Sequence, residues 1–203
     1  GGLIMGHGDD KGLRLPPVLA PTQAVVLLVR DEDGAGDAAR DLAGQLQAAG
    51  VRTRLDDAVA TSFGRRATDH ELKGIPVRLE VGPRDLKEGM VTLVRRDTSE
   101  KVSVPVGEAA GRVPGLLDEI QAALKAEAAQ LLADRTAQVT SLDDAVEAAA
   151  TGFAELPGEL IQGGGEAKLA EQGVTVRVVR RADGGLPQAD DEPDTIATVA
   201  RAY

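Results

Sequence analysis

The chain has 203 residues, a length that accommodates one large domain or two small ones. Hydrophobic residues make up 42% and charged residues 28%, which is a globular balance, and the lack of any run near ~18 apolar residues excludes a transmembrane helix. The sequence has no cysteine, which excludes disulfides, thiolate catalysis and cysteine-ligated zinc. Aromatic residues make up only 1%, which excludes aromatic platforms that stack single-stranded nucleic acid.

The charge is unevenly distributed along the chain. The formal net charge of −10 argues against a general binder of polyanions. Residues 62–101 nevertheless carry nine basic and seven acidic side chains and form a basic region in an acidic chain. This pattern favours a selective contact with a polyanion.

The N-terminal segment is rich in Gly, Asp and Pro. The first residue is Gly1 and no signal peptide follows it, so we expect the chain to be the C-terminal part of a longer protein. Residues 6–21 are expected to form a loop and an extended linker. His7, Asp9 and Asp10 lie too close together to enclose a metal ion unaided, so we interpret them as a structured turn.

Residues 22–112 are expected to form an α/β domain. The apolar run from Gln23 to Arg30 predicts a strand buried on both faces, and Asp37 is expected to cap a helix that ends at Gly50. A second helix is expected over residues 63–73, and further strands are expected over residues 51–55, 75–81, 90–94 and 101–106. This order predicts a mixed five-stranded sheet with helices on its faces.

Residues 113–203 are expected to form a long helix followed by a small α+β domain. The helix is predicted over about residues 113–134, and Ser141 with Asp144 is expected to cap the next one. A short helix follows the glycines of 163–165, and strands over 174–179 and 195–200 are expected to pair. The three glycines are not a phosphate loop, since no strand precedes them and no Lys-Ser/Thr pair follows.

Charged residues cluster between Phe63 and Lys101 and have two interpretations. Composition alone favours a solvated surface of ion pairs. Chemistry also allows a guanine-binding site, because a carboxylate accepts the N1–H and N2–H of an unpaired guanine while Arg or Lys donates to O6 and N7. The charged side chains that cluster at helix ends and turns around one strand are Arg65, Arg66, Glu71, Lys73, Arg78, Arg84 and Asp85. Arg65 and Arg66 are expected to contact phosphates.

Three segments carry a resemblance to a known family. HGDDKGLRLPPVLAPTQ, ELKGIPVRLEVGPRDL and LVRRDTSEK resemble the C-terminal part of prolyl-tRNA synthetases of the archaeal/eukaryotic-like type, which are class II aminoacyl-tRNA synthetases. The resemblance implies residues 1–21 as the tail of a catalytic domain and its linker, residues 22–112 as the anticodon-binding domain and residues 113–203 as the C-terminal domain. It also implies a cytoplasmic, homodimeric parent enzyme that uses ATP and Mg²⁺ to attach proline to tRNA(Pro).

The resemblance also implies roles for individual residues. It assigns recognition of the anticodon guanines to Glu71, Arg78, Arg84 and Asp85, with Lys101 as a further contact. We expect the first four of these residues to meet at one end of the sheet. The terminal carboxylate of Tyr203 is expected to face the catalytic domain. The sequence departs from many relatives in three ways: Ala67 and His70 replace aromatic residues, and the cysteines of a C-terminal zinc site are missing, so we expect no zinc.

A second interpretation comes from a different functional class. The chain would then be a freestanding α/β interaction module that keeps the fold and has lost tRNA recognition. Neither interpretation involves DNA or a membrane as a partner. The sequence preceding Gly1 distinguishes them, because a class II catalytic domain there identifies the ligase.

Overall fold

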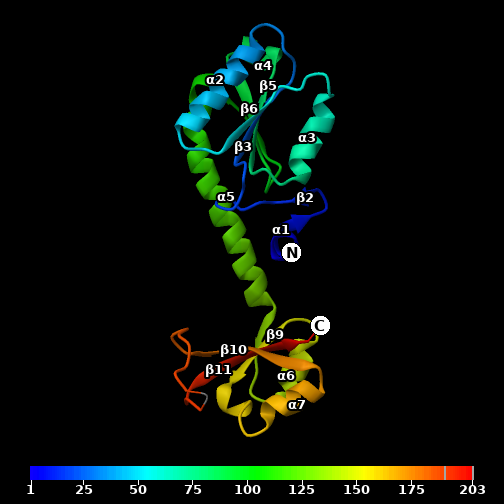
Figure 1. Ribbon diagram of the computed structural model, residues 1–203, viewed down its shortest axis with the longest axis vertical. Helices are drawn as coiled ribbons and strands as arrows, with labels where there is room; N and C mark the ends of the chain where they lie inside the picture. The colour runs from blue at the N-terminus through cyan, green and yellow to red at the C-terminus, as the bar shows by residue number, and fades with distance from the viewer. Residues whose placement is uncertain (190, 203) are drawn as a thin grey trace. The chain divides into compact units, whose positions relative to one another are not determined.

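The computed structural model describes residues 1–189 and 191–202, and these form two compact units, residues 1–128 and 129–203 (Figure 1). The prediction for Tyr203 lies outside the described residues. Among the helices of the described residues, none is both long and apolar enough to cross a membrane.

The first unit is built on a mixed sheet of five strands. Parallel pairing joins β4 to β3 and β3 to β5, and antiparallel pairing joins β5 to β6 and β6 to β7. The predicted fold class is therefore confirmed. The strands, in their order across the sheet, are β4 (Thr53–Asp56), β3 (Ala24–Leu28), β5 (Val77–Val81), β6 (Met90–Arg95) and β7 (Lys101–Pro105).

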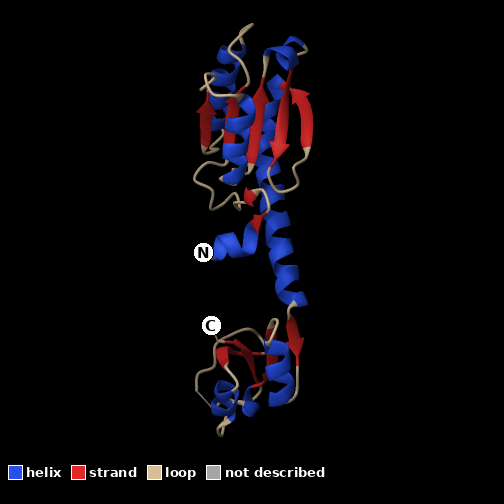
Figure 2. Cartoon of the chain, turned by 90° about the vertical axis from the view of Figure 1, so that its right-hand side faces the viewer, coloured by secondary structure: helices blue, strands red, loops and turns tan. Residues whose placement is uncertain are grey.

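Two helices cover one face of this sheet, as Figures 1 and 2 show. They are α2 (Ala35–Ala48) and the first part of α5 (Val106–Asp134). The apolar sides of these helices pack on alternate residues of the strands, and these strand residues are almost fully buried. Val26 of β3, Leu79 of β5 and Val91 of β6 are typical of this core.

The opposite face of the sheet is only partly covered. Helix α3 (Phe63–Leu72) lies on this side, where its Ala67 and His70 are buried and its Arg66 donates to the carbonyl oxygen of Leu28 in β3. The two positions expected to depart from the family pattern, Ala67 and His70, are thus both buried. The alternate residues of β5, β6 and β7 that point to this face are half-buried or exposed, except Val94.

Several boundaries differ from the predictions. Helix α2 begins at Ala35 with Gly34 at its N-cap in a left-handed conformation, so Asp37 lies inside the first turn and is not the cap. A short helix, α4 (Pro83–Lys87), follows β5 and was not predicted. Helix α5 begins seven residues before Val113 and includes Pro114. The N-terminal segment forms α1 (Gly2–His7) and a small antiparallel pair, β1 (Gly8–Asp9) and β2 (Gly12–Leu13).

The second unit has a four-stranded sheet in the order β10-β11-β9-β8. Strands β10 (Val174–Arg181) and β11 (Thr195–Arg201) pair antiparallel, as predicted, and Ser141 caps α6 (Leu142–Ala149) through the amide of Asp144. Two further strands, β8 (Thr136–Gln138) and β9 (Phe153–Pro157), were not predicted. Helices α6 and α7 (Gly165–Glu171) contribute to the apolar core of this unit.

Candidate nucleic-acid interface

The open half of the five-stranded sheet carries the polar side chains of β5, β6 and β7. Arg78 and Glu80 point to this face from β5, because successive side chains of a strand alternate between its faces. Their register partners are Val94 and Thr92 of β6, and Val94 in turn pairs with Lys101 of β7. Helices α2 and α5 pack on the other face, so these side chains remain available to a ligand.

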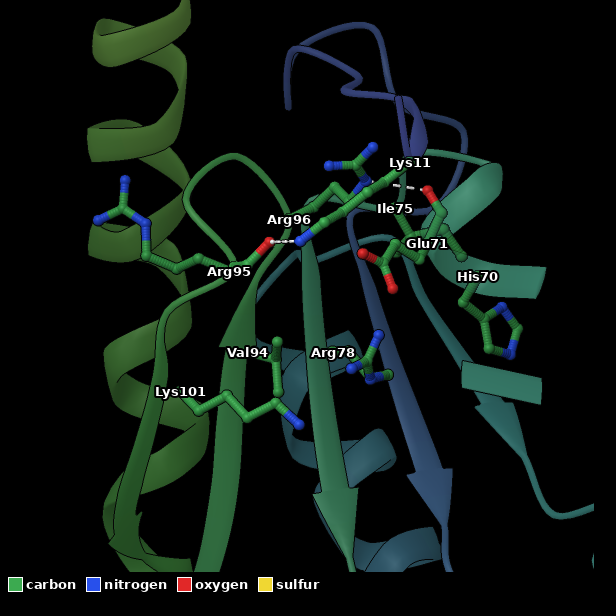
Figure 3. Close-up of a pocket in the computed structure, with 10 residues that line it drawn as sticks. Lys11, His70, Glu71, Ile75, Arg78, Val94, Arg95, Arg96 and Lys101 are labelled. Atoms are coloured by element: carbon green, nitrogen blue, oxygen red, sulfur yellow. Dashed lines mark hydrogen bonds between the residues drawn. The ribbon is translucent and has the colours of Figure 1, made fainter. Parts of the chain in front are cut away.

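A pocket of about 210 Å³ lies at one end of this face (Figure 3). Its walls include three of the predicted anticodon-binding residues, Glu71, Arg78 and Lys101. They come from the end of α3, the start of β5 and the start of β7, which tertiary structure brings together. The N-terminal segment adds Lys11, which sequence reasoning did not place here.

The charges around the pocket are unequally paired. Arg78 donates to Glu80 at 2.9 Å, and the ammonium group of Lys101 lies 3.9 Å from the same carboxylate, so two cations share one anion. Glu71 is half-buried, and its carboxylate has no hydrogen-bond or ion-pair partner among the residues that the structure describes. A free acceptor therefore stands beside cations with donors to spare, which is the arrangement that a guanine edge requires.

Arg84 and Asp85 lie at the other end of β5, on α4. The five residues of that strand span roughly 16 Å, so the expectation that Glu71, Arg78, Arg84 and Asp85 meet at one end of the sheet is wrong. The carboxylate of Asp85 nevertheless accepts a hydrogen bond of 3.3 Å from Thr92 on the open face. The structure thus places one carboxylate toward each end of that face.

The two arginines expected to contact phosphates differ sharply. Arg65 is exposed on α3 and has no side-chain partner within the described part of the chain. Arg66 has only 4% of its surface exposed and donates to the carbonyl oxygens of Leu28 and Thr61 and to the carboxylate of Asp56. The expectation that Arg66 contacts a phosphate is therefore wrong, because its buried guanidinium is occupied by hydrogen bonds within the protein.

Asp56 also accepts a hydrogen bond from Nε2 of His70, at 2.6 Å. Burial raises the pKa of the Asp56 carboxyl, but the hydrogen bonds from His70 and Arg66 outweigh it and hold this pKa below its usual range. Nδ1 of His70 has no hydrogen-bond partner in the described structure. These contacts attach α3 to β4 and fix the helix that carries Glu71.

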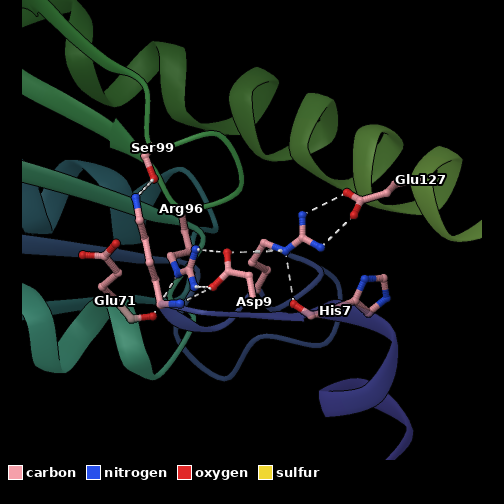
Figure 4. Close-up of polar contacts among 8 residues, drawn as sticks. His7, Asp9, Glu71, Arg96, Ser99 and Glu127 are labelled. Atoms are coloured by element: carbon pink, nitrogen blue, oxygen red, sulfur yellow. Dashed lines mark hydrogen bonds and ion pairs between the residues drawn. The ribbon is translucent and has the colours of Figure 1, made fainter.

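The N-terminal segment is attached to the same region through Asp9 (Figure 4). Arg96 donates to both carboxylate oxygens of Asp9, at 2.6 and 2.9 Å, and to the carbonyl oxygen of Glu71 at 2.9 Å. The hydrogen bond from Arg96 outweighs desolvation and, together with the amide of Lys11, lowers the pKa of Asp9 to about 2. Arg14 forms a bidentate pair with Glu127 of α5. The segment is therefore fixed to the sheet and to α5.

Two residues of this site were not predicted: Lys11, which lines the pocket, and Glu80, which accepts a hydrogen bond from Arg78. The sequence pattern could have identified Glu80, since the alternation of IPVRLEV places it on the same face of the strand as Arg78. Lys11 had no local signal, because its position depends on a contact with Ser99 that is remote in sequence. Across the residues described, no group of three or more His, Cys, Asp or Glu side chains is arranged to hold a metal ion.

Comparisons with known proteins relate this site to a family. Residues 23–116 match the model of the HGTP anticodon binding domain. A proline--tRNA ligase from Frankia alni is 58% identical over all of this chain and 44% of its own length, and one from Rubrobacter xylanophilus is 37% identical with the same coverage. The chain belongs to the proline--tRNA ligase family.

Solved structures agree with this assignment. A crystal structure of prolyl-tRNA synthetase from Cryptosporidium parvum, complexed with L-proline and AMP, superimposes with a TM-score of 0.81 at 26% identity. The match covers 98% of this chain and 45% of that one. The chain therefore spans less than half the length of these relatives. Its residues 23–116, which match the anticodon-binding domain, carry the open sheet face and the lining of its pocket except Lys11.

Proposed function

We propose that the chain is the C-terminal portion of a proline--tRNA ligase and that its open sheet face reads the guanines of the tRNA(Pro) anticodon. The observation that carries this proposal is the unpaired carboxylate of Glu71, which lies in one pocket with Arg78 and Lys101. A surface ion-pair network would neutralise this carboxylate. A binding site for a ligand with hydrogen-bond donors leaves the carboxylate of Glu71 unpaired until the ligand binds.

The geometry supports a specific reading of the first guanine. Glu71 accepts the N1–H and N2–H of the base, and the cations around Glu80 donate to O6 and N7 on its other edge. Adenine has neither the N2 amino group nor an O6 acceptor, so it leaves the carboxylate without a bidentate partner and offers the cations N7 alone. Each such bidentate contact supplies roughly 1–3 kcal/mol of discrimination.

The second carboxylate supports recognition of a second guanine. Asp85 lies toward the opposite end of the open face, beside the exposed Arg84, and repeats the combination of an acceptor and a cation. Proline anticodons end in two guanines, and unpaired bases of an RNA loop are splayed apart when proteins read them. We assign one guanine to each end of the face, while the exposed Arg65 adds affinity through phosphates without sequence preference.

The decisive experiment measures RNA affinity of Glu71→Gln. An RNA hairpin with the tRNA(Pro) anticodon loop is compared with hairpins in which each guanine in turn is replaced by adenine. We expect the wild-type chain to bind the guanine hairpin about tenfold to a hundredfold more tightly than either adenine hairpin. The variant is expected to lose this preference at the guanine position that Glu71 reads and to keep it at the other. The control is Glu147→Gln, which changes an exposed glutamate of α6.

Two results would overturn the proposal. The first is equal binding of the guanine and adenine hairpins by the wild-type chain, which is what a freestanding interaction module would show. The second is a Glu71→Gln variant that keeps the full preference for guanine over adenine at both positions, which would identify the surface as an ordinary ion-pair network.

The rest of the activity is assigned to the full-length ligase. We place proline activation with ATP and Mg²⁺ in the part of that enzyme outside these 203 residues, in a cytoplasmic homodimer. The Cryptosporidium parvum structure with L-proline and AMP supports this division, since the match covers 45% of that chain.

A further inference from the structure

The N-terminal segment lies against the end of α3 that carries Glu71. Gly12 has a φ of +117°, and a Cβ there would lie 2.7 Å from the Cα atom of Leu72. The amide of Leu15 donates to the carbonyl oxygen of Gly74 at 3.1 Å, directly after the helix. A segment that approaches the helix this closely forms part of the wall around the pocket.

Lys11 is the side chain that this segment contributes to the pocket. Its ammonium group donates to the hydroxyl oxygen of Ser99, at 3.1 Å, in the turn between β6 and β7. Figure 3 shows Lys11 and Arg78 on opposite sides of the Glu71 carboxylate. An ammonium group has three donors, and within the described part of the chain only one of these is used.

The position of Lys11 is fixed by its neighbours. The Lys11 amide donates to Asp9 at 2.9 Å, and Asp9 is held by both terminal nitrogens of Arg96. Arg96 is buried, with 5% of its surface exposed, and also donates to the carbonyl oxygen of Glu71. One guanidinium therefore sets the distance between the segment that carries Lys11 and the residue that carries the free carboxylate.

We propose that Lys11 contacts the RNA directly, as a fourth charged residue of the pocket formed with Glu71, Arg78 and Lys101, and that the Asp9–Arg96 pair positions it. This inference rests on the proposed function. Its ligand is an electronegative acceptor of the nucleotide bound at Glu71, which is either the N7/O6 edge of the guanine or its phosphate. Lys11 thereby makes the linker before the sheet part of the reading site.

The test compares Lys11→Met with Lys125→Met in binding the same hairpins. Both variants remove one exposed positive charge, but Lys125 lies on α5 outside the pocket. We expect Lys11→Met to weaken binding of the cognate hairpin about tenfold at low salt and Lys125→Met to leave it nearly unchanged. Melting temperatures of both variants should stay close to the wild type, since the Asp9–Arg96 pair is intact.

Two further measurements identify the acceptor. If Lys11 contacts the base, replacing the guanine by 7-deazaguanine weakens the wild-type complex more than the Lys11→Met complex. If Lys11 contacts the phosphate, the slope of log affinity against log salt falls by about one in Lys11→Met, and 7-deazaguanine affects both proteins alike.

The outcomes separate this inference from the function on which it rests. Wild-type protein without any preference for guanine would overturn the proposed function. A wild-type preference for guanine, combined with equal affinities of Lys11→Met and Lys125→Met, would overturn the role of Lys11 alone.

Discussion

Arg65 and Arg66 show how adjacent residues of one helix serve different purposes. The side chain of Arg65 is solvated, whereas Arg66 links α3 to β3 and β4 through three acceptor residues. Removing a buried guanidinium leaves these acceptors desolvated and unpaired.

We expect Arg66→Met to destabilise the first unit by about 3 kcal/mol, because it leaves the half-buried carboxylate of Asp56 without its guanidinium partner. Arg65→Met is expected to leave stability unchanged and to reduce the salt dependence of RNA binding. Urea denaturation and hairpin titrations distinguish the two. Equal stability of both variants would show that Arg66 has no structural role.

The carboxyl group of Asp9 predicts an acid-sensitive contact. Its pKa is lowered to about 2 by the hydrogen bond from Arg96, so the ion pair stabilises the fold fully above the unfolded pKa of about 3.9 and is lost as the pH falls through 2. Asp9→Asn should therefore melt at a lower temperature than the wild type at pH 7 and converge with it near pH 2. A temperature difference that does not change with pH would contradict this expectation.

The elements predicted from the sequence are those with a strong local pattern. The apolar run of β3 and the alternation in β5 identify both strands, and the predicted helix over 63–73 coincides with α3 to within one residue. Helix α4 has five residues and too few turns to show a periodicity. The start of α5 was missed because Gly107, Gly111 and Pro114 are typical of loops, although packing on the sheet keeps them helical.

The pocket was predictable only in part. Glu71 and Arg78 lie seven positions apart and were recognised by residue type and resemblance, and the turn between β6 and β7 then returns Lys101 to the same end of the sheet. Arg84 lies at the opposite end of β5 from this group, because the strand runs from one end of the sheet to the other. The sequence pattern alone does not reveal this separation. The burial of Arg66 depends on acceptors in three other segments, so its local sequence carries no sign of it.

The contact of the N-terminal segment with α3 depends on Gly12. Gly12→Ala adds a Cβ that meets the backbone of Leu72 and places alanine at a positive φ, so we expect a destabilisation of about 1–3 kcal/mol. Gly44→Ala is the matched control, because Gly44 is exposed within α2 with nothing near its Cβ position, and we expect a stabilisation of about 1 kcal/mol. Thermal denaturation measures both, and a neutral Gly12→Ala would show that the segment is loosely held.

The whole molecule is expected to bind RNA without performing the ligation. We predict that these 203 residues alone give no proline-dependent pyrophosphate exchange, while the full-length ligase does, because proline activation is assigned to a different part of that enzyme. The assay is exchange of labelled pyrophosphate into ATP. Activity of the isolated chain above background would overturn this division.

Composition leads to a second prediction for the whole molecule. With no cysteine and only two histidines, the chain lacks the usual ligands of a structural zinc ion, so purified protein should contain no stoichiometric zinc and should melt at the same temperature with or without a chelator. Elemental analysis tests this. One equivalent of bound zinc would contradict it.

The bidentate contact between Arg96 and Asp9 has a consequence for where the anticodon-binding unit can be cut. The family match begins at residue 23, and a chain shortened to that point keeps all five strands of the sheet. It loses Asp9, however, so the guanidinium of Arg96 is left without its carboxylate partner, and of its described side-chain contacts it keeps the one to the carbonyl oxygen of Glu71. A piece that keeps the pocket lining and the Asp9–Arg96 pair is therefore longer than the family match and includes Asp9 and Lys11.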